Sequence, residues 1–207
     1  MKILSHRGYW VEETEKNTKT AFLRSFGLGF GTETDVRDCN GNLVISHDPP
    51  NGKEMMFREL LLLCPNGITL ALNIKADGLA EKIIQELSRF PLIDWFVFDM
   101  SIPDMRGYIN DDNSVFARMS EVESVPPWIE KCEGVWLDAF ENIWYDFKTI
   151  DGLLRMGKKV CIVSSELHKR DYLKLWNMLK NIPEFINSDK TYLCTDYPEK
   201  AKLYFGV

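Results

Sequence analysis

Residues 31–50 read G-T-E-T-D-V-R-D-C-N-G-N-L-V-I-S-H-D-P-P. Glu33 and Asp35 are two positions apart in a predicted strand, so both carboxylates lie on one face of it and can share a cation. Asn40-Gly41 is a turn signal that folds the chain back as a hairpin and carries His47 toward the two acids. This stretch therefore predicts a strand, a hairpin and a cation site close together.

The length of the hairpin loop decides where His47 points. A two-residue loop, Asn40-Gly41, pairs Thr34 with His47 and turns the histidine away from the carboxylates, because directly opposed residues share a face. A three-residue loop that includes Cys39 pairs Glu33 with His47 and places the histidine beside both acids. We predict the three-residue loop, or a bulge with the same effect.

Strands and helices alternate along the whole chain. Eight predicted strands alternate with eight helical segments, and no linker or shift in composition divides residues 1–207. This pattern is typical of a parallel sheet, and eight repeats predict one α/β domain: a small (β/α)8 TIM barrel with shortened outer helices and a β-hairpin after the second strand. A doubly wound open sheet is the alternative. The predicted barrel strands are 2–5, 30–36, 68–74, 95–98, 115–118, 135–137, 159–163 and 191–194.

Polar residues recur where these predicted strands end. They are His6, Asn73 with Lys75, Asp99, Asp138, Ser164 with Ser165, and Asp196. The carboxyl ends of the strands form the face of such a barrel at which chemistry takes place. Each residue alone could be a helix cap, but core packing does not account for polar groups at one end of so many strands.

The composition limits the partners that the chain can have. A net charge of −6 gives no electrostatic footprint for nucleic acid, and no apolar run approaches the roughly 18 residues that span a bilayer. The N-terminus reaches His6 and Arg7 too early for a signal peptide. The five cysteines form no CxxC pair, which favours free thiols over disulfides or a zinc site. We expect a cytoplasmic protein with no stable membrane insertion.

The acids, histidines and basic residues at the strand ends suit one kind of chemistry. Glu33 and Asp35 on an exposed strand would be an ordinary solvated pair. Phe30, Gly31 and Val36 around them indicate a buried strand, and buried carboxylates need a cation or strong hydrogen-bond donors. Oxygen ligands favour Mg²⁺, Ca²⁺ or Mn²⁺ over zinc.

The histidines and the basic residues fit the same interpretation. His6 and His47 are suited to acid–base catalysis, since the pKa of imidazole is near working pH; a structural imidazole is the alternative for each. Arg7 and Lys75 suit phosphate recognition or salt bridges to the acids. His168, beside Lys169 and Arg170, is expected on the surface.

Several short motifs occur in order between His6 and Pro198. They are H-R-G at His6, N-T at Asn17, E-T-D-V at Glu33, N-G at Asn40, H-D-P at His47 and T-D-Y-P at Thr195. Together they resemble the glycerophosphodiester phosphodiesterase family, within the phospholipase-C-like phosphodiesterase superfamily.

This resemblance implies a (β/α)8 barrel and a divalent-metal phosphodiesterase. It also implies His6 and His47 as the acid–base pair, Glu33 and Asp35 as metal ligands, and Arg7 and Lys75 as phosphate contacts.

The chain departs from the family pattern at its third strand. The family has a motif resembling I-E-I-K, whose glutamate is a third metal ligand, whereas residues 72–75 read L-N-I-K. The family's W-T-V-N segment also becomes I-V-S-S at residues 162–165. An amide oxygen binds Mg²⁺ or Ca²⁺ more weakly than a carboxylate. Asn73 is the predicted third ligand; the alternatives are that Asp99 or Asp138 replaces it, or that the site has lost its metal.

The resulting prediction is metal-dependent hydrolysis of a glycerophosphodiester or a similar water-soluble phosphodiester. Two alternatives remain open. One is a catalytically weakened barrel that binds a polyol phosphate. The other is a lyase resembling sphingomyelinase D, which would release a cyclic phosphate.

Overall fold

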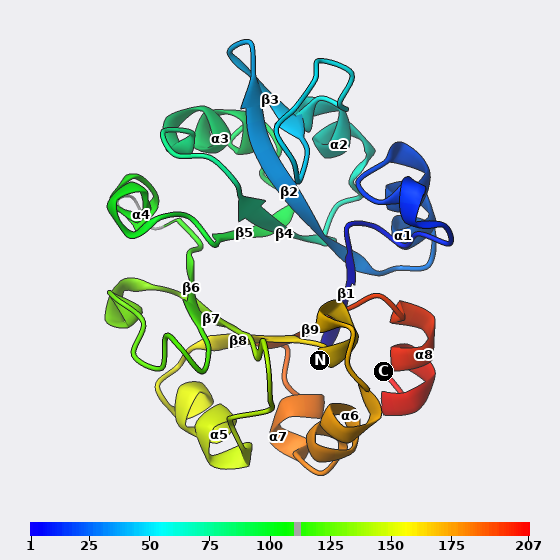
Figure 1. Ribbon diagram of the computed structural model, residues 1–207, viewed down its shortest axis with the longest axis vertical. Coiled ribbons are helices and arrows are strands. Elements are labelled where there is room, and N and C mark those ends of the chain that lie inside the picture. Colours follow the sequence, from blue (N-terminus) through cyan, green and yellow to red (C-terminus); the bar gives the residue numbers. More distant parts are fainter. Residues whose placement is uncertain (110–112) are drawn as a thin grey trace.

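Eight parallel strands form a ring at the centre of the computed structural model, which describes residues 1–109 and 113–207 (Figure 1). Their order around the ring is β5-β4-β2-β1-β9-β8-β7-β6. A parallel bridge between Val97 and Val115 links β5 to β6, so the ring is nearly closed. The predicted TIM barrel is confirmed. The strands are β1 Lys2–His6, β2 Gly31–Cys39, β4 Thr69–Ile74, β5 Asp94–Phe98, β6 Phe116–Met119, β7 Gly134–Leu137, β8 Lys159–Val163 and β9 Thr191–Thr195.

Short helices surround the ring, as the length of the chain predicts. The longest have nine residues, and the described part of the chain between β6 and β7 has only a 3-10 turn, η2 Ile129–Lys131. The α-helices are α1 Lys19–Gly27, α2 Phe57–Leu63, α3 Ala80–Leu87, α4 Ile102–Ile109, α5 Phe147–Arg155, α6 Leu173–Lys180, α7 Pro183–Ile186 and α8 Pro198–Phe205. Two further 3-10 turns are η1 Glu13–Glu15 and η3 Ser165–His168.

Alternate residues of the strands fill the barrel with aromatic rings. The rings of Phe96 and Phe116 stack with centroids 3.8 Å apart, and those of Phe98 and Trp136 stack at the same distance. The opposite faces of the strands pack against the helices. The polar ends of the strands are therefore held on a rigid, close-packed support.

The predicted hairpin is present, but its predicted loop is wrong. β3 (Asn42–Ile45) pairs antiparallel with β2, and Cys39 faces Asn42 across a two-residue loop. Asn40 and Gly41 have φ angles of 50° and 82°, the paired positive values that Asn-Gly adopts in tight hairpins. Local turn chemistry therefore sets the register. β3 ends at Ile45, so His47 lies beyond the ladder.

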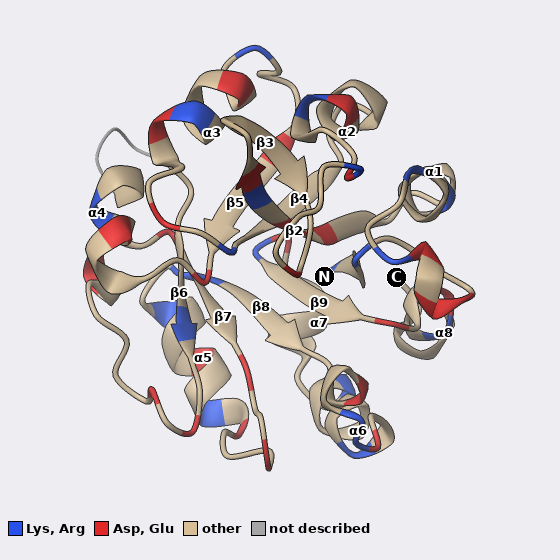
Figure 2. Cartoon of the chain, turned by 45° about the horizontal axis from the view of Figure 1, so that its top comes forward, with Lys and Arg blue, Asp and Glu red and all other residues tan. Residues whose placement is uncertain are grey.

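Charges of both signs are interspersed over the outer helices (Figure 2). None of the helices in the described part of the chain combines the length and the apolar character needed to cross a bilayer. All five cysteines are unpaired, as predicted. The expectation that the protein binds no nucleic acid stays a prediction.

Gly31 lies where β2 comes too close to its neighbours for a side chain. A β-carbon at this position would lie 2.5 Å from Leu4 Cδ2 and 2.6 Å from the Thr69 carbonyl oxygen. We expect Gly31→Ala to lower the free energy of unfolding by about 1–3 kcal/mol in urea denaturation, because overpacking displaces the backbone.

The matched control is Gly152→Ala in α5, where a β-carbon would meet no atom within 4 Å. This substitution should leave stability unchanged or raise it by up to about 1 kcal/mol, since alanine favours helix more than glycine does. Equal stability of Gly31→Ala and the wild-type protein would contradict the packing described for β2.

Candidate active site

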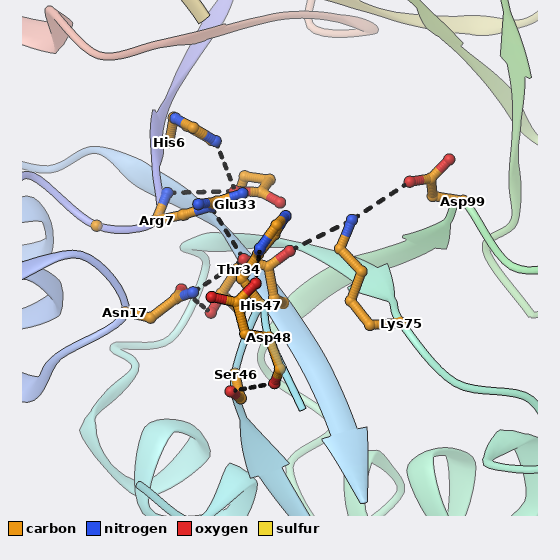
Figure 3. Close-up of polar contacts among 12 residues, drawn as sticks. His6, Arg7, Asn17, Glu33, Thr34, Ser46, His47, Asp48, Lys75 and Asp99 are labelled. Carbon is orange, nitrogen blue, oxygen red and sulfur yellow. Dashed lines mark hydrogen bonds and ion pairs between the residues drawn. The ribbon is translucent and has the colours of Figure 1, made fainter. Parts of the chain in front are cut away.

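The strand register brings the predicted acids and their partners to one end of the barrel. His6 of β1 is paired with Glu33 of β2, and Asp35 of β2 is paired with Asn73 of β4. Paired residues of parallel strands lie side by side, so these four side chains form one cluster at the carboxyl ends of three adjacent strands. Figure 3 shows the side chain of His6 directed toward Glu33 and the backbone nitrogen of Arg7 bonded to the same carboxyl group.

Glu33 is a buried carboxyl with few donors. Its side chain is 2% exposed, and Oε2 accepts a hydrogen bond from the backbone N–H of Arg7 at 3.2 Å. Burial, together with the negative charge of Asp35, raises the pKa of Glu33 to about 7, although His6, Arg7 and Lys75 oppose this. Without a bound cation, much of Glu33 therefore carries a proton near neutral pH.

Asp35 is fully buried and has two cationic neighbours. Its Oδ2 lies 3.0 Å from Arg7 Nε and accepts a hydrogen bond from Asn17 Nδ2 at 2.9 Å. Its Oδ1 lies 3.6 Å from Lys75 Nζ. The left-handed backbone of Arg7, with φ at 57°, turns the chain back over β2 at the end of β1. The carboxylate is thus compensated from within the protein.

The charges continue across the mouth of the barrel. Lys75 Nζ also lies 3.5 Å from Asp99 Oδ2, and Arg118 forms an ion pair with the other oxygen of Asp99 (Figure 3 shows Lys75 and Asp99). Arg118 in turn lies 2.5 Å from Glu123. Arg118 was not predicted as a site residue, although an arginine within a short apolar strand is a detectable signal.

A carboxylate fixes the ring of His6. His6 Nδ1 lies 2.8 Å from Asp196 Oδ1, and Asp196 is itself held by its backbone N–H, which donates to Glu166 Oε1 at 3.1 Å. The other ring nitrogen, Nε2, lies 4.0 Å from Glu33 Oε2. This arrangement leaves Nε2 to exchange protons beside the buried carboxyls.

His47 and His6 line two adjoining cavities. His6, Glu33 and Asn73 line a cavity of about 190 Å³, whereas His47 lines a groove of about 1140 Å³ next to the hairpin. Arg7 borders both. The His47 ring pairs with Asp48 at 2.9 Å, and the two side chains are 45% and 88% exposed. The contacts found for the His47 side chain do not include either buried acid, so its catalytic role stays a prediction.

His168 was expected on the surface, but only 25% of its side chain is exposed and it lies inside the mouth of the barrel. Its Nε2 lies 2.7 Å from Asp138 Oδ1, and both residues line the small cavity with His6. The placement depends on the 3-10 turn η3 after β8, where the sequence pattern predicts a helix that begins at His168. Asp138 pairs with His168, and Asp99 pairs with Lys75 and Arg118. Asp35 has cationic partners as well, so the alternative that Asp99 or Asp138 replaces Asn73 stays a prediction.

The oxygen atoms of the cluster suit a hard cation. Asp35 Oδ1 and Asn73 Oδ1 are both buried without a hydrogen-bond partner, and the buried Glu33 lies on the same strand face as Asp35. Mg²⁺ and Ca²⁺ prefer such carboxylate and amide oxygens. Among the described residues, no three Asp, Glu, His or Cys side chains converge on one point; the third ligand would have to be the amide of Asn73.

Solved structures similar to this chain are phosphodiesterases. The glycerophosphodiester phosphodiesterase of Agrobacterium tumefaciens has 16% identity and a TM-score of 0.65, with 100% of each chain covered. For the enzyme of Thermotoga maritima the values are 12% and 0.65, with 97% of each chain covered. The glycerophosphoryl diester phosphodiesterase of Parabacteroides distasonis has 14% identity and a TM-score of 0.70, with 99% of this chain and 86% of that chain covered.

The chain has the fold of these phosphodiesterases. The sequence itself matches no protein-family model and no curated protein. At these identities the likeness establishes the fold alone. Any activity has to be argued from the side chains at the ends of the strands.

The buried carboxyl of Glu33 should make stability depend on pH. Its pKa is raised from 4.5 to about 7 by burial and by Asp35, so between these values the folded protein keeps a proton that the unfolded chain releases. The stability of the wild-type protein should therefore fall as the pH rises through this interval. With a chelator present, the free energy of unfolding of Glu33→Gln, measured by urea denaturation, should rise relative to that of the wild-type protein. The expected rise is on the order of 1 kcal/mol for each pH unit in this interval. A difference that stays constant from about pH 5 to about pH 8 would contradict the described environment of Glu33.

Proposed function

We propose that the protein hydrolyses a glycerophosphodiester or a similar small, water-soluble phosphodiester with the help of a divalent metal. The observation that carries the proposal is the cluster of oxygen ligands from Glu33, Asp35 and Asn73 beside the two cations Arg7 and Lys75. The fold shared with glycerophosphodiester phosphodiesterases supports it. The five unpaired cysteines fit the cytoplasmic location expected from the sequence.

Glu33, Asp35 and Asn73 would hold the metal, which when bound would neutralise charge on the phosphate and acidify a bound hydroxyl or water. Mg²⁺ and Ca²⁺ suit these ligands best, and Mn²⁺ is a further candidate. A neutral amide in place of a carboxylate weakens such a site.

Arg7 and Lys75 would bind the phosphate. Both side chains are about one-fifth exposed and border Asp35, so their donors are partly available to a ligand. Positive groups that are fixed before the substrate arrives stabilise the negative charge that grows in the transition state.

Two proton transfers accompany hydrolysis, one from the nucleophile and one to the leaving alcohol. His6 Nε2, oriented by the bond of Nδ1 to Asp196, would carry the first. The family resemblance implies His47 as the partner of His6, and we assign the second transfer to it; Arg7 borders the cavities of both histidines.

A polyol-phosphate binding protein is the second candidate. It is favoured by one observation: Arg7 and Lys75 already compensate Asp35, and Asn73 adds no charge. Both candidates use the same residues for the phosphate, and only catalysis separates them.

We expect the purified protein to cleave glycerophosphodiesters when Mg²⁺, Ca²⁺ or Mn²⁺ is added, and chelation to abolish the activity. His6→Gln should lower kcat by roughly 10²- to 10⁴-fold, the usual contribution of an acid–base group. Phosphorus NMR of the product distinguishes the hydrolase from a lyase, since a lyase releases a cyclic phosphate. Intact substrate with all three metals, together with binding of glycerol phosphate, would favour the binding protein.

Asn73→Glu should restore a third anionic ligand. We expect tighter binding of Mg²⁺ in isothermal titration calorimetry and a higher rate at limiting metal, because an anionic ligand attracts the cation more strongly. The control is Asn73→Asp, which adds the same charge on a side chain that is one methylene group shorter than that of glutamate. Weaker metal binding by Asn73→Glu than by the wild-type protein would contradict the assignment of Asn73 as a ligand.

A further inference from the structure

Ser164 has a hydroxyl group at the position where the family pattern W-T-V-N has valine. It follows β8 directly, it is completely buried, and its backbone N–H donates to the carbonyl of Cys194 in β9 at 2.9 Å. Its side chain therefore lies where the ends of β8 and β9 meet. β9 leads directly into Asp196, which binds Nδ1 of His6. This departure from the family pattern thus lies beside the partner of His6.

Glu166 accepts hydrogen bonds from both strand ends. Ser164 Oγ donates to Glu166 Oε2, and Thr195 Oγ1 at the end of β9 donates to Glu166 Oε1. The backbone N–H of Asp196 donates to the same Oε1 at 3.1 Å. Glu166 is partly buried and belongs to the first turn of η3. One carboxylate therefore connects the end of β8 to the residue that holds His6.

Groups that can only donate set the direction of these hydrogen bonds. Trp176 Nε1 of α6 donates to Ser164 Oγ at 2.8 Å, and the backbone N–H of Tyr197 donates to Thr195 Oγ1 at 3.0 Å. Each hydroxyl oxygen accepts from such a group, so its own proton is left for Glu166. Burial raises the pKa of Glu166, and the bonds from Ser164 and Thr195 oppose this rise. Every donor of the network is thus directed at one carboxylate.

Asp196 connects this network to the ring of His6. Ser5 of β1 is paired with Thr195 of β9, so the next residues, His6 and Asp196, lie side by side. Their side chains are 16% and 12% exposed, and His6 Nδ1 lies 2.8 Å from Asp196 Oδ1. An ionised carboxylate only accepts hydrogen bonds, so Nδ1 carries the proton of the neutral ring and Nε2 has the lone pair.

Resting on the proposed function, we propose that Glu166 is a positioning residue that holds Asp196 and thereby keeps the proton of the neutral His6 ring on Nδ1. In this tautomer the lone pair of Nε2 is free to take the proton of the nucleophile. The contacts found for the Glu166 side chain join it to Asp196 and to the two hydroxyls, and do not include the buried acids. Glu166 therefore acts on His6 through Asp196.

The tautomer of His6 can be measured without reference to activity. We label histidine with an NMR-active nitrogen isotope and record the ring shifts at about pH 8 without metal, where an ordinary imidazole is neutral. His47→Gln and His168→Gln assign the signals of the three histidines. In the wild-type protein, we expect the proton of His6 on Nδ1. In Glu166→Ala, the shift of Nε2 should move toward that of a protonated nitrogen, because Asp196 is no longer held against Nδ1.

Two further variants and a control separate positioning from a tie between strands. Ser164→Ala removes a donor to Glu166 and should move the His6 shifts in the same direction. The matched control is Ser120→Ala, since Ser120 is equally buried but its Oγ has no hydrogen-bond partner in the described part of the chain; the His6 shifts should stay unchanged. Glu166→Gln keeps an oxygen for the N–H of Asp196 and should keep the wild-type tautomer. These variants decide the question if Glu166→Ala does not fold.

Hydrolysis of glycerophosphoethanolamine with Mg²⁺ gives the second readout. For Glu166→Ala we expect kcat to fall by roughly 10- to 100-fold, the range typical of the loss of a group that orients a functional histidine. KM should stay nearly unchanged, because the residue acts on the proton transfer and does not bind the substrate. Glu166→Gln should recover most of the lost kcat.

Two results would overturn the proposal. One is a wild-type tautomer of His6 in both Glu166→Ala and Ser164→Ala, which would leave Glu166 a structural tie between β8 and β9. The other is a wild-type His6 ring with its proton on Nε2. If the expected shifts appear but the wild-type protein cleaves no glycerophosphodiester, the proposed function fails and the positioning of His6 by Glu166 stands. The two failures are therefore distinguishable.

Discussion

The structure depends on how the side chain of one fully buried acid, Asp35, is compensated by its neighbours. Burying an isolated charge is prohibitively unfavourable, so an anion at this depth needs a cation or several donors. The protein supplies Arg7, Lys75 and the amide of Asn17. The left-handed backbone of Arg7, the turn before α1 and the end of β4 bring these three groups to a single carboxylate.

This compensation also defines the chemistry that the mouth of the barrel can perform. The cations that compensate Asp35 are the ones that we propose to bind the phosphate, and a divalent metal would compete with them for the carboxylate oxygens. Glu33 has fewer hydrogen-bond donors than Asp35 has. Its pKa is raised because His6, Arg7 and Lys75 do not fully offset burial and the charge of Asp35. Asn73, with its unpartnered oxygen, suits a cation without adding another negative charge. The cluster therefore has oxygen atoms that suit a metal ion and cationic side chains that suit an anion.

Pattern and chemistry along the chain predicted the barrel, the hairpin and the acids at the strand ends, because these follow from local periodicity and from the geometry of parallel strands. The hairpin loop was predicted wrongly because a functional expectation about His47 was preferred to the strong local preference of Asn40-Gly41. His168 was missed for another reason. Its partner Asp138 is thirty residues away, at the end of the neighbouring strand. The predicted barrel already makes β7 and β8 neighbours, but the 3-10 turn η3, which brings His168 to Asp138, was not predicted.

The central claim is that the oxygens at the ends of β2 and β4 form a divalent-metal site. Anomalous diffraction from crystals soaked in Mn²⁺ tests it most directly, since it locates the ion without reference to activity. The account predicts one anomalous peak bound by Glu33, Asp35 and the side-chain oxygen of Asn73. A mouth with no peak at saturating Mn²⁺, or a peak bound by Asp99 or Asp138 instead, would contradict it.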